Sequence, residues 1–64
     1  MSGQGFRFAV GELVWIRKET IGGTVVRRYH RKGIEDAYEV SINGRTYNFD
    51  DHELAKHPWF AERI

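Results

Sequence analysis

The chain has 64 residues and no cysteine, carries a formal net charge of +1, and is 41% hydrophobic and 30% charged. A domain of this size buries only about 60% of the surface that its unfolded chain exposes. The absence of cysteine excludes disulfides and thiolate metal centres, and no apolar run approaches the ~20 residues of a membrane helix. We therefore expect a soluble, cytoplasmic domain that does not bind membranes.

The first half of the domain is expected to contain two strands. Residues 1–5, MSGQG, are small and polar and predict a disordered leader. The alternating stretch 10–18, VGELVWIRK, predicts a strand with Val14 and Ile16 on one side. Residues 23–30, GTVVRRYH, are rich in β-branched and aromatic side chains and predict a second, longer strand.

The second half is expected to contain a hairpin and a helical turn. Residues 36–42, DAYEVSI, and 45–49, RTYNF, predict strands joined by Asn43-Gly44, which favours a type I′ turn. The polar segment after them predicts one helical turn near residues 50–55. Residues 57–64 follow, containing Pro58 and the apolar WFAERI, and are expected to add a closing strand or to dock on the barrel or on a partner.

Four or five short strands with glycine-bearing turns predict an all-β fold, a small antiparallel barrel whose closure removes exposed edges. Its expected core lies on the inward faces of these strands: Val14, Ile16, Val25, Tyr38, Val40, Ile42, Phe49 and Leu54. A spaced pattern of apolar residues and glycines carries a family resemblance: Gly11-x-x-Val14-x-Ile16, Gly23-x-Val25, Tyr38-x-Val40, Asn43-Gly44, Phe49 and Glu53-Leu54.

This pattern resembles the SH3-like barrels of the Tudor and KOW type. The resemblance spans roughly residues 8–56 and implies a five-stranded SH3-like antiparallel barrel, which we expect over residues 6–56, with one short 3-10 or helical turn near residues 50–55. The chain is also distantly similar to type II dihydrofolate reductase, whose Val-Gln-Ile-Tyr run corresponds to residues 46–49, Thr-Tyr-Asn-Phe. The glutamine and isoleucine with which that run binds cofactor and substrate are absent here, so the resemblance carries over no catalytic residue and no cofactor. What it still implies is that a barrel this small can work as a homo-oligomer.

The charged residues are unevenly distributed along the chain. Residues 1–33 contain seven Lys or Arg and two acids, whereas residues 34–64 contain three Lys or Arg and seven acids. Such asymmetry favours either a basic face for a polyanion or complementary faces that pair between copies of the chain.

A basic run with interleaved aromatics is the predicted binding site for nucleic acid or a protein partner, because phosphates attract several cations and rings stack on unpaired bases. Its residues are Trp15, Arg17, Lys18, Arg27, Arg28, Tyr29, His30, Arg31 and Lys32. On an alternating strand, Arg28 and His30 share one face, opposite Arg27 and Tyr29. The alternative is a solvated hairpin end whose counter-ions are Glu35 and Asp36.

Two further groupings have structural alternatives. An aromatic cage for a methylated cation would combine Asp50 or Asp51 with rings that a small barrel also needs for its core: Trp15, Tyr29, Tyr38, Tyr47 and Phe49. A metal site would combine His52 and His57 with nearby acids, Asp50, Asp51 and Glu53. His52 and His57 are five residues apart, a spacing that places them neither on one face of a helix nor on one face of a strand. We therefore interpret both histidines as surface residues and assign no metal.

No nucleophile, base or phosphate-binding loop stands out, so we expect no enzymatic activity. The sequence favours a non-catalytic binding module that recognises nucleic acid or a protein partner through the basic strand and exposed aromatics. The alternative is a structural homo-oligomer whose complementary charged faces pair between copies.

Overall fold

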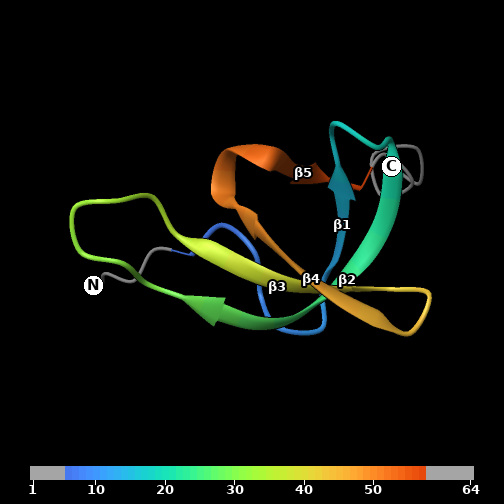
Figure 1. The fold of residues 1–64 in the computed structure, drawn as a ribbon, viewed down its shortest axis with the longest axis horizontal. Coiled ribbons are helices and arrows are strands. Elements are labelled where there is room, and N and C mark those ends of the chain that lie inside the picture. Colours follow the sequence, from blue (N-terminus) through green and yellow to red (C-terminus); the bar gives the residue numbers. More distant parts are fainter. Residues whose placement is uncertain (1–5, 58–64) are drawn as a thin grey trace.

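The computed structural model describes residues 6–57 as one antiparallel β-sheet (Figure 1). Its elements in chain order are β1 (Leu13–Ile16), β2 (Ile21–Tyr29), β3 (Ala37–Ile42), β4 (Arg45–Asp50), the 3-10 turn η1 (Asp51–Glu53) and β5 (Leu54–Lys56). The five strands are ordered β4-β3-β2-β1-β5. This confirms the all-β prediction and the short turn. The sheet does not close, because β4 and β5 are its two edges, so the expected barrel is not confirmed.

Several sequence predictions fall partly or wholly outside this range. The expected leader, residues 1–5, and residues 58–64 of the expected docked segment lie outside the described residues. The described residues, 6–57, contain no helix that could span a bilayer.

The long strand β2 bends and so folds the sheet over its core. Its first part lies beside β1, where Val14 pairs with Gly23, and its second part lies beside β3, where Tyr29 pairs with Ala37 (Figure 1). At the bend, β3 packs directly against the backbone of Gly23. A Cβ atom there would lie 2.5 Å from Cγ1 of Val40, so this position needs glycine.

A β-bulge changes the alternation within β2. Val25 pairs with Val40 and Arg27 pairs with Glu39, so Val26 is an extra residue in the ladder. Because paired residues share a face, Val25 points into the core with Val40, and Arg27 points outward with Glu39.

The core contains most of the expected side chains. Six of the eight predicted residues are fully buried: Val14, Ile16, Val25, Tyr38, Val40 and Leu54. The other two, Ile42 and Phe49, pack against this core but are only partly buried. They lie toward the side on which the sheet stays open, where no further strand covers them.

The core also contains a residue that precedes all the strands. Phe8 is only 2% exposed, and its ring packs edge-on against Tyr38 with a centroid distance of 5.4 Å. Phe6 approaches the same tyrosine ring at 6.1 Å. The segment before β1 therefore seals one end of the sheet.

The fifth strand begins earlier than the polar segment suggested. The helical turn was expected to reach residue 55, but η1 ends at Glu53 and β5 follows directly. Glu53 is the last residue of the turn, and its carboxylate caps the start of the turn by accepting a hydrogen bond from the Asp50 N–H at 2.8 Å. Leu54 then pairs with Ile16 and is fully buried, so long-range pairing with β1 determines the conformation here.

Candidate functional site

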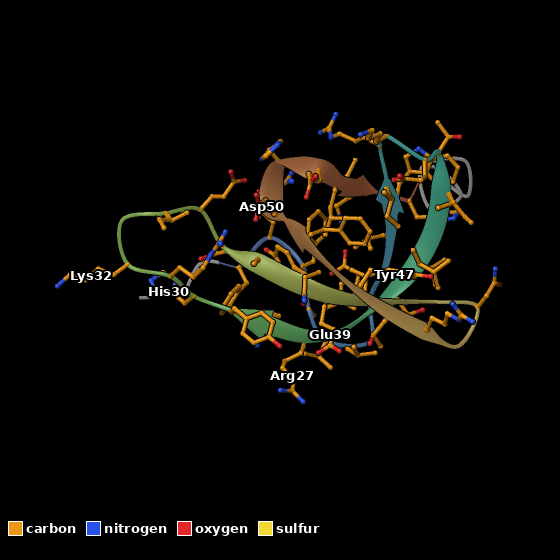
Figure 2. All side chains as sticks on the ribbon, in the orientation of Figure 1. Arg27, His30, Lys32, Glu39, Tyr47 and Asp50 are labelled. Atoms are coloured by element: carbon orange, nitrogen blue, oxygen red, sulfur yellow. The ribbon has the colours of Figure 1, made fainter. Side chains whose placement is uncertain are left out.

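The predicted basic site does not form as one surface. Arg17 and Lys18 lie in the turn between β1 and β2, whereas Arg31 and Lys32 lie in the loop between β2 and β3. These segments are at opposite ends of β2, and Lys32 points away from the sheet at the tip of its loop (Figure 2). Trp15 lies in β1, where its ring packs edge-on against His57 at 5.3 Å.

Acidic partners within the domain neutralise much of the basic hairpin. Arg31 contacts Asp50 at 2.9 Å, and its Nε and Nη2 also donate to the Glu35 carbonyl at 3.1 and 2.8 Å. A further ion pair joins Arg27 to Glu39 at 3.6 Å (Figure 2). Nδ1 of His30 lies 2.8 Å from Oδ1 of Asp36. These contacts favour the solvated-hairpin interpretation.

The two faces of the hairpin have different roles. Arg28 lies over the Phe6 ring at 4.6 Å, and His30 meets the same ring edge-on at 6.1 Å. The hydroxyl of Tyr29 contacts Glu39 instead, at 3.4 Å, on the side to which Arg27 points. The predicted division of these side chains between faces is therefore confirmed, and Arg28 holds the segment before β1.

The aromatic residues proposed for a cage do not converge. Tyr38 is fully buried, and Trp15, which lies on β1, packs against His57. Tyr47 and Phe49 are neighbours on β4 with ring centroids 6.5 Å apart. The rings of this grouping therefore do not surround a common point.

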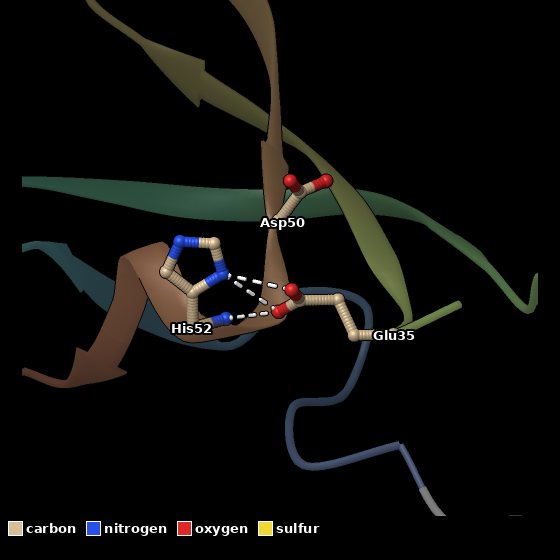
Figure 3. A group of neighbouring side chains, drawn as sticks. All are labelled: Glu35, Asp50 and His52. Carbon is tan, nitrogen blue, oxygen red and sulfur yellow. Dashed lines mark hydrogen bonds and ion pairs between the residues drawn. The ribbon is translucent and has the colours of Figure 1, made fainter.

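A group of metal-ligand type forms, but with different members from those expected. Potential ligand atoms of Glu35, Asp50 and His52 lie within 4.8 Å of one another (Figure 3). Sequence reasoning missed Glu35 as a member, because the β3–β4 hairpin brings it beside residues far along the chain. The other expected ligand, His57, packs against Trp15.

Within this group, hydrogen bonds connect the β2–β3 loop to η1. Nδ1 of His52 lies 2.8 and 2.9 Å from the two carboxylate oxygens of Glu35, and the His52 backbone N–H donates to Oε2 at 2.7 Å (Figure 3). The backbone bond and then the side-chain bond lower the Glu35 pKa, and the Glu35 carboxylate raises the His52 pKa. We call Glu35 and His52 the loop clasp, because their hydrogen bonds hold the β2–β3 loop against η1. Both carboxylate oxygens of Glu35 and Nδ1 of His52 already have partners in these bonds.

A concavity of about 550 Å³ lies beside the hairpin, and its lining combines both charge signs with apolar surface. Ala37 contributes to this lining and is only 8% exposed, although its strand alternation places it opposite the core. Arg31 and Asp50 also line the space, where they pair with each other. The charges of Arg31 and Asp50 are therefore already paired with each other and are not available to bind a ligand in the concavity.

The open side of the sheet forms a different and more apolar groove. This groove has a volume of about 440 Å³ and is lined by Ile21, Ile42, Tyr47 and Glu19. Tyr47 pairs with the core residue Val40 and so shares its face, yet its side chain remains 45% exposed. The groove is where the inner face of the sheet reaches solvent beside an unpaired edge.

The turn before β4 determines which of its backbone groups lie on that edge. Asn43 and Gly44 have φ angles of 52° and 82°, as a two-residue type I′ turn requires. The flanking residues Ile42 and Arg45 form a hydrogen-bonded pair in such a hairpin, and bonded and non-bonded pairs then alternate. The β4 residues whose N–H and C=O groups point away from β3 are therefore Thr46, Asn48 and Asp50.

Contacts at the end of β4 agree with this alternation. The Asp51 N–H donates back to the Asp36 carbonyl at 2.8 Å, while the Asp50 N–H points away and is bound by Glu53. In the described part of the chain, the outward backbone groups of Thr46 and Asn48 have no hydrogen-bond partner. Sequence reasoning missed this edge, because it expected a closed barrel.

Comparisons with protein-family models, with curated proteins and with solved structures find no significant match. The candidate site is therefore defined by its geometry: an apolar groove with one carboxylate, bordered by four unpaired backbone groups of β4.

Proposed function

We propose that this domain is a cytoplasmic, non-catalytic binding module with an SH3-like architecture. It takes up an extended segment of a protein partner along the open side of its sheet. The segment pairs with the edge of β4 and places an apolar side chain in the groove beside Tyr47. The observation that carries this proposal is that an exposed, six-residue edge strand borders an apolar groove.

The order of the elements supports the SH3-like assignment. Four strands follow one another as a meander, a 3-10 turn follows β4, and β5 returns to pair with β1. A bent β2 shared between both halves of the sheet is typical of small curled sheets of this kind. The assignment concerns architecture, and many unrelated functions use it.

Strand addition is a recurrent mode of peptide recognition, in which main-chain hydrogen bonds supply affinity and pockets for alternate side chains supply specificity. The open side of this sheet offers both elements. Thr46 and Asn48 present the main-chain groups, and Ile21, Ile42 and Tyr47 line the pocket. Glu19 adds a carboxylate, so the groove favours an apolar segment that carries a lysine or arginine.

The charge distribution favours a protein partner over a nucleic acid. Phosphate binding needs several free cations within reach of one backbone. In this domain the hairpin cations Arg27 and Arg31 pair with internal acids, and Lys18 and Lys32 lie at opposite ends of β2.

An NMR titration tests the proposal with two ligands, a short extended peptide of alternating valine and lysine and a single-stranded oligonucleotide. We expect the peptide to shift amide signals of β4 and of the start of β2. The Tyr47→Ser variant should weaken peptide binding about tenfold, because it removes the ring beside the groove. The control is Tyr29→Ser, which removes an exposed tyrosine from the other face of the sheet.

Two results would contradict the proposal. One is that the peptide causes no shifts on β4. The other is that the oligonucleotide binds the hairpin at low salt more tightly than the peptide binds β4, which would restore the nucleic-acid interpretation.

A further inference from the structure

The edge of β4 has a fixed set of unpaired backbone groups. Thr46 and Asn48 each turn one N–H and one C=O outward, whereas the outward N–H of Asp50 is already bound to Glu53. A strand that satisfies this edge completely must therefore form its hydrogen bonds at Thr46 and Asn48.

Antiparallel pairing of β4 with another β4 meets this requirement in one symmetric register. When Thr46 pairs with the partner's Asn48, Asn48 pairs with the partner's Thr46, and all four free groups on each strand are bonded. The two-fold axis then passes beside Tyr47, which faces the partner's Tyr47 as a non-hydrogen-bonded pair. Side chains approach most closely in such pairs, and aromatic pairs are favourable there. Moving the axis to Asn48 would instead require the Asp50 N–H.

The charges along the strand are complementary when it runs antiparallel to itself. β4 begins with Arg45, which has no ion pair within the described residues, and ends with Asp50, followed by Asp51 in η1. Antiparallel pairing places the unpaired Arg45 of each strand near the end of the other strand that carries Asp50, although the two side chains project from opposite faces and Asp50 and Asp51 also contact Arg31 and Arg7. Parallel pairing would instead set the two unpaired Arg45 side chains beside each other.

We propose that β4 of a second copy of this chain is the segment that occupies the β4 edge, paired antiparallel about a two-fold axis at Tyr47. This inference rests on the proposed function, since it names the partner of the same edge. The resulting dimer has a continuous sheet through both subunits and covers two edges that would otherwise invite non-specific pairing.

Sedimentation equilibrium over a concentration series up to about 1 mM tests this dimer. We expect the wild type to dimerise and Tyr47→Lys to weaken dimerisation at least about tenfold, because it sets two like charges against each other at the axis. Asn48→Pro should have the same effect, since it removes an outward N–H without breaking a bond to β3. Tyr29→Lys is the matched control and should dimerise like the wild type.

Amide hydrogen exchange of the wild type provides a test that needs no variant. The amides of Thr46 and Asn48 should exchange more slowly as the protein concentration rises, and an unchanged exchange rate in a concentrated sample would contradict the register. A dimer that Asn48→Pro leaves intact, with native circular dichroism, would overturn the proposal.

The two proposals fail in different ways. If the wild type is monomeric at about 1 mM and the valine-lysine peptide still shifts β4, the second copy is not the partner and the binding module stands. If the wild type is monomeric and the peptide leaves β4 unchanged, both proposals are wrong.

Discussion

The phenolic hydroxyl of Tyr38 donates a hydrogen bond to Oδ2 of Asp51 at 2.9 Å. The same phenolic oxygen accepts a bond from the Arg7 N–H at 3.1 Å, and Nε of Arg7 donates to Oδ1 of Asp51 at 2.8 Å. One carboxylate at the start of η1 therefore joins the segment before β1 to a buried residue of β3. Asp51 is also held next to β3 by its own N–H, which donates to the Asp36 carbonyl at 2.8 Å.

Removing the Tyr38 hydroxyl should destabilise the domain. In Tyr38→Phe the Arg7 N–H and the Asp51 carboxylate each lose a partner, and such a loss costs about 1–2 kcal/mol of unfolding free energy. Urea unfolding followed by circular dichroism measures this change. Tyr29→Phe is the control, because its exposed hydroxyl makes only a 3.4 Å contact and its loss should cost less than about 0.5 kcal/mol. Equal effects of the two variants would argue against the role of the Asp51 contact.

Gly23→Ala should destabilise the domain by overpacking. The added methyl group would lie 2.5 Å from Cγ1 of Val40 and 3.0 Å from Cγ1 of Ile42, so we expect a loss of about 1–3 kcal/mol. Val40→Ala removes the atom that clashes, and the double variant should be more stable than the sum of the two single changes predicts. Thermal unfolding of the four proteins measures this coupling, and strictly additive losses would contradict the close packing at the bend.

The assignment of faces in β3 can be tested with one charge at two neighbouring positions. Val40 is fully buried, so Val40→Asp would bury an unpaired carboxylate and should prevent folding. Ser41 lies on the opposite face and is only half-buried, so Ser41→Asp should leave the circular dichroism spectrum native. A native spectrum for Val40→Asp would show that the faces are wrongly assigned.

The loop clasp should depend on pH in two directions. The His52 pKa is raised from its usual 6.5, so its contribution to stability is complete below pH 6.5 and is lost as the pH rises through the raised pKa. The Glu35 pKa is lowered from its usual 4.5, so its contribution is present above pH 4.5 and is lost as the pH falls through the lowered pKa. The clasp is therefore strongest between pH 4.5 and 6.5, where Glu35 is ionised and His52 is protonated.

An NMR titration of the His52 ring measures this coupling. In Glu35→Gln the pKa of His52 should fall toward 6.5, because the hydrogen bond and the charge that raise it are both weakened. Asp36→Asn removes a carboxylate of the same loop that pairs with His30 instead, so it should leave the His52 titration unchanged. If His52 titrates identically in the wild type and Glu35→Gln, the clasp does not operate in solution.

Local patterns in the sequence predict much of this fold. Alternation placed Val14 and Ile16 on the inner face of β1 and Tyr38 and Val40 on that of β3, and all four are buried. The Asn43-Gly44 dipeptide located the hairpin turn, because its backbone requirement is local. These features depend on residues that are close together in the chain.

Features that depend on distant segments could not be predicted. β5 exists because Leu54 pairs with Ile16, and Phe8 is buried because the sheet curls over it. The clasp partner of His52 is Glu35, 17 residues earlier, and no spacing rule connects the two. The acids that pair with Arg27 and Arg31 likewise come from β3 and β4, so the local sequence pattern of the basic run did not predict these ion pairs.

The bulge at Val26 affects how the gene can tolerate changes in length. Val25 and Val26 are adjacent and identical, so losing either codon gives the same protein, in which β2 pairs with β3 as a regular ladder. Arg27 and Tyr29 then keep their outward orientation. Deleting one of residues 27–29 shifts the pairing of β2 with β3 by one residue, which would turn every following side chain to the opposite face. Such a deletion should be tolerated only if Val26 leaves the bulge and joins the ladder, because this restores the original pairing. This pair of valines is therefore the position in the hairpin where natural length variants are expected.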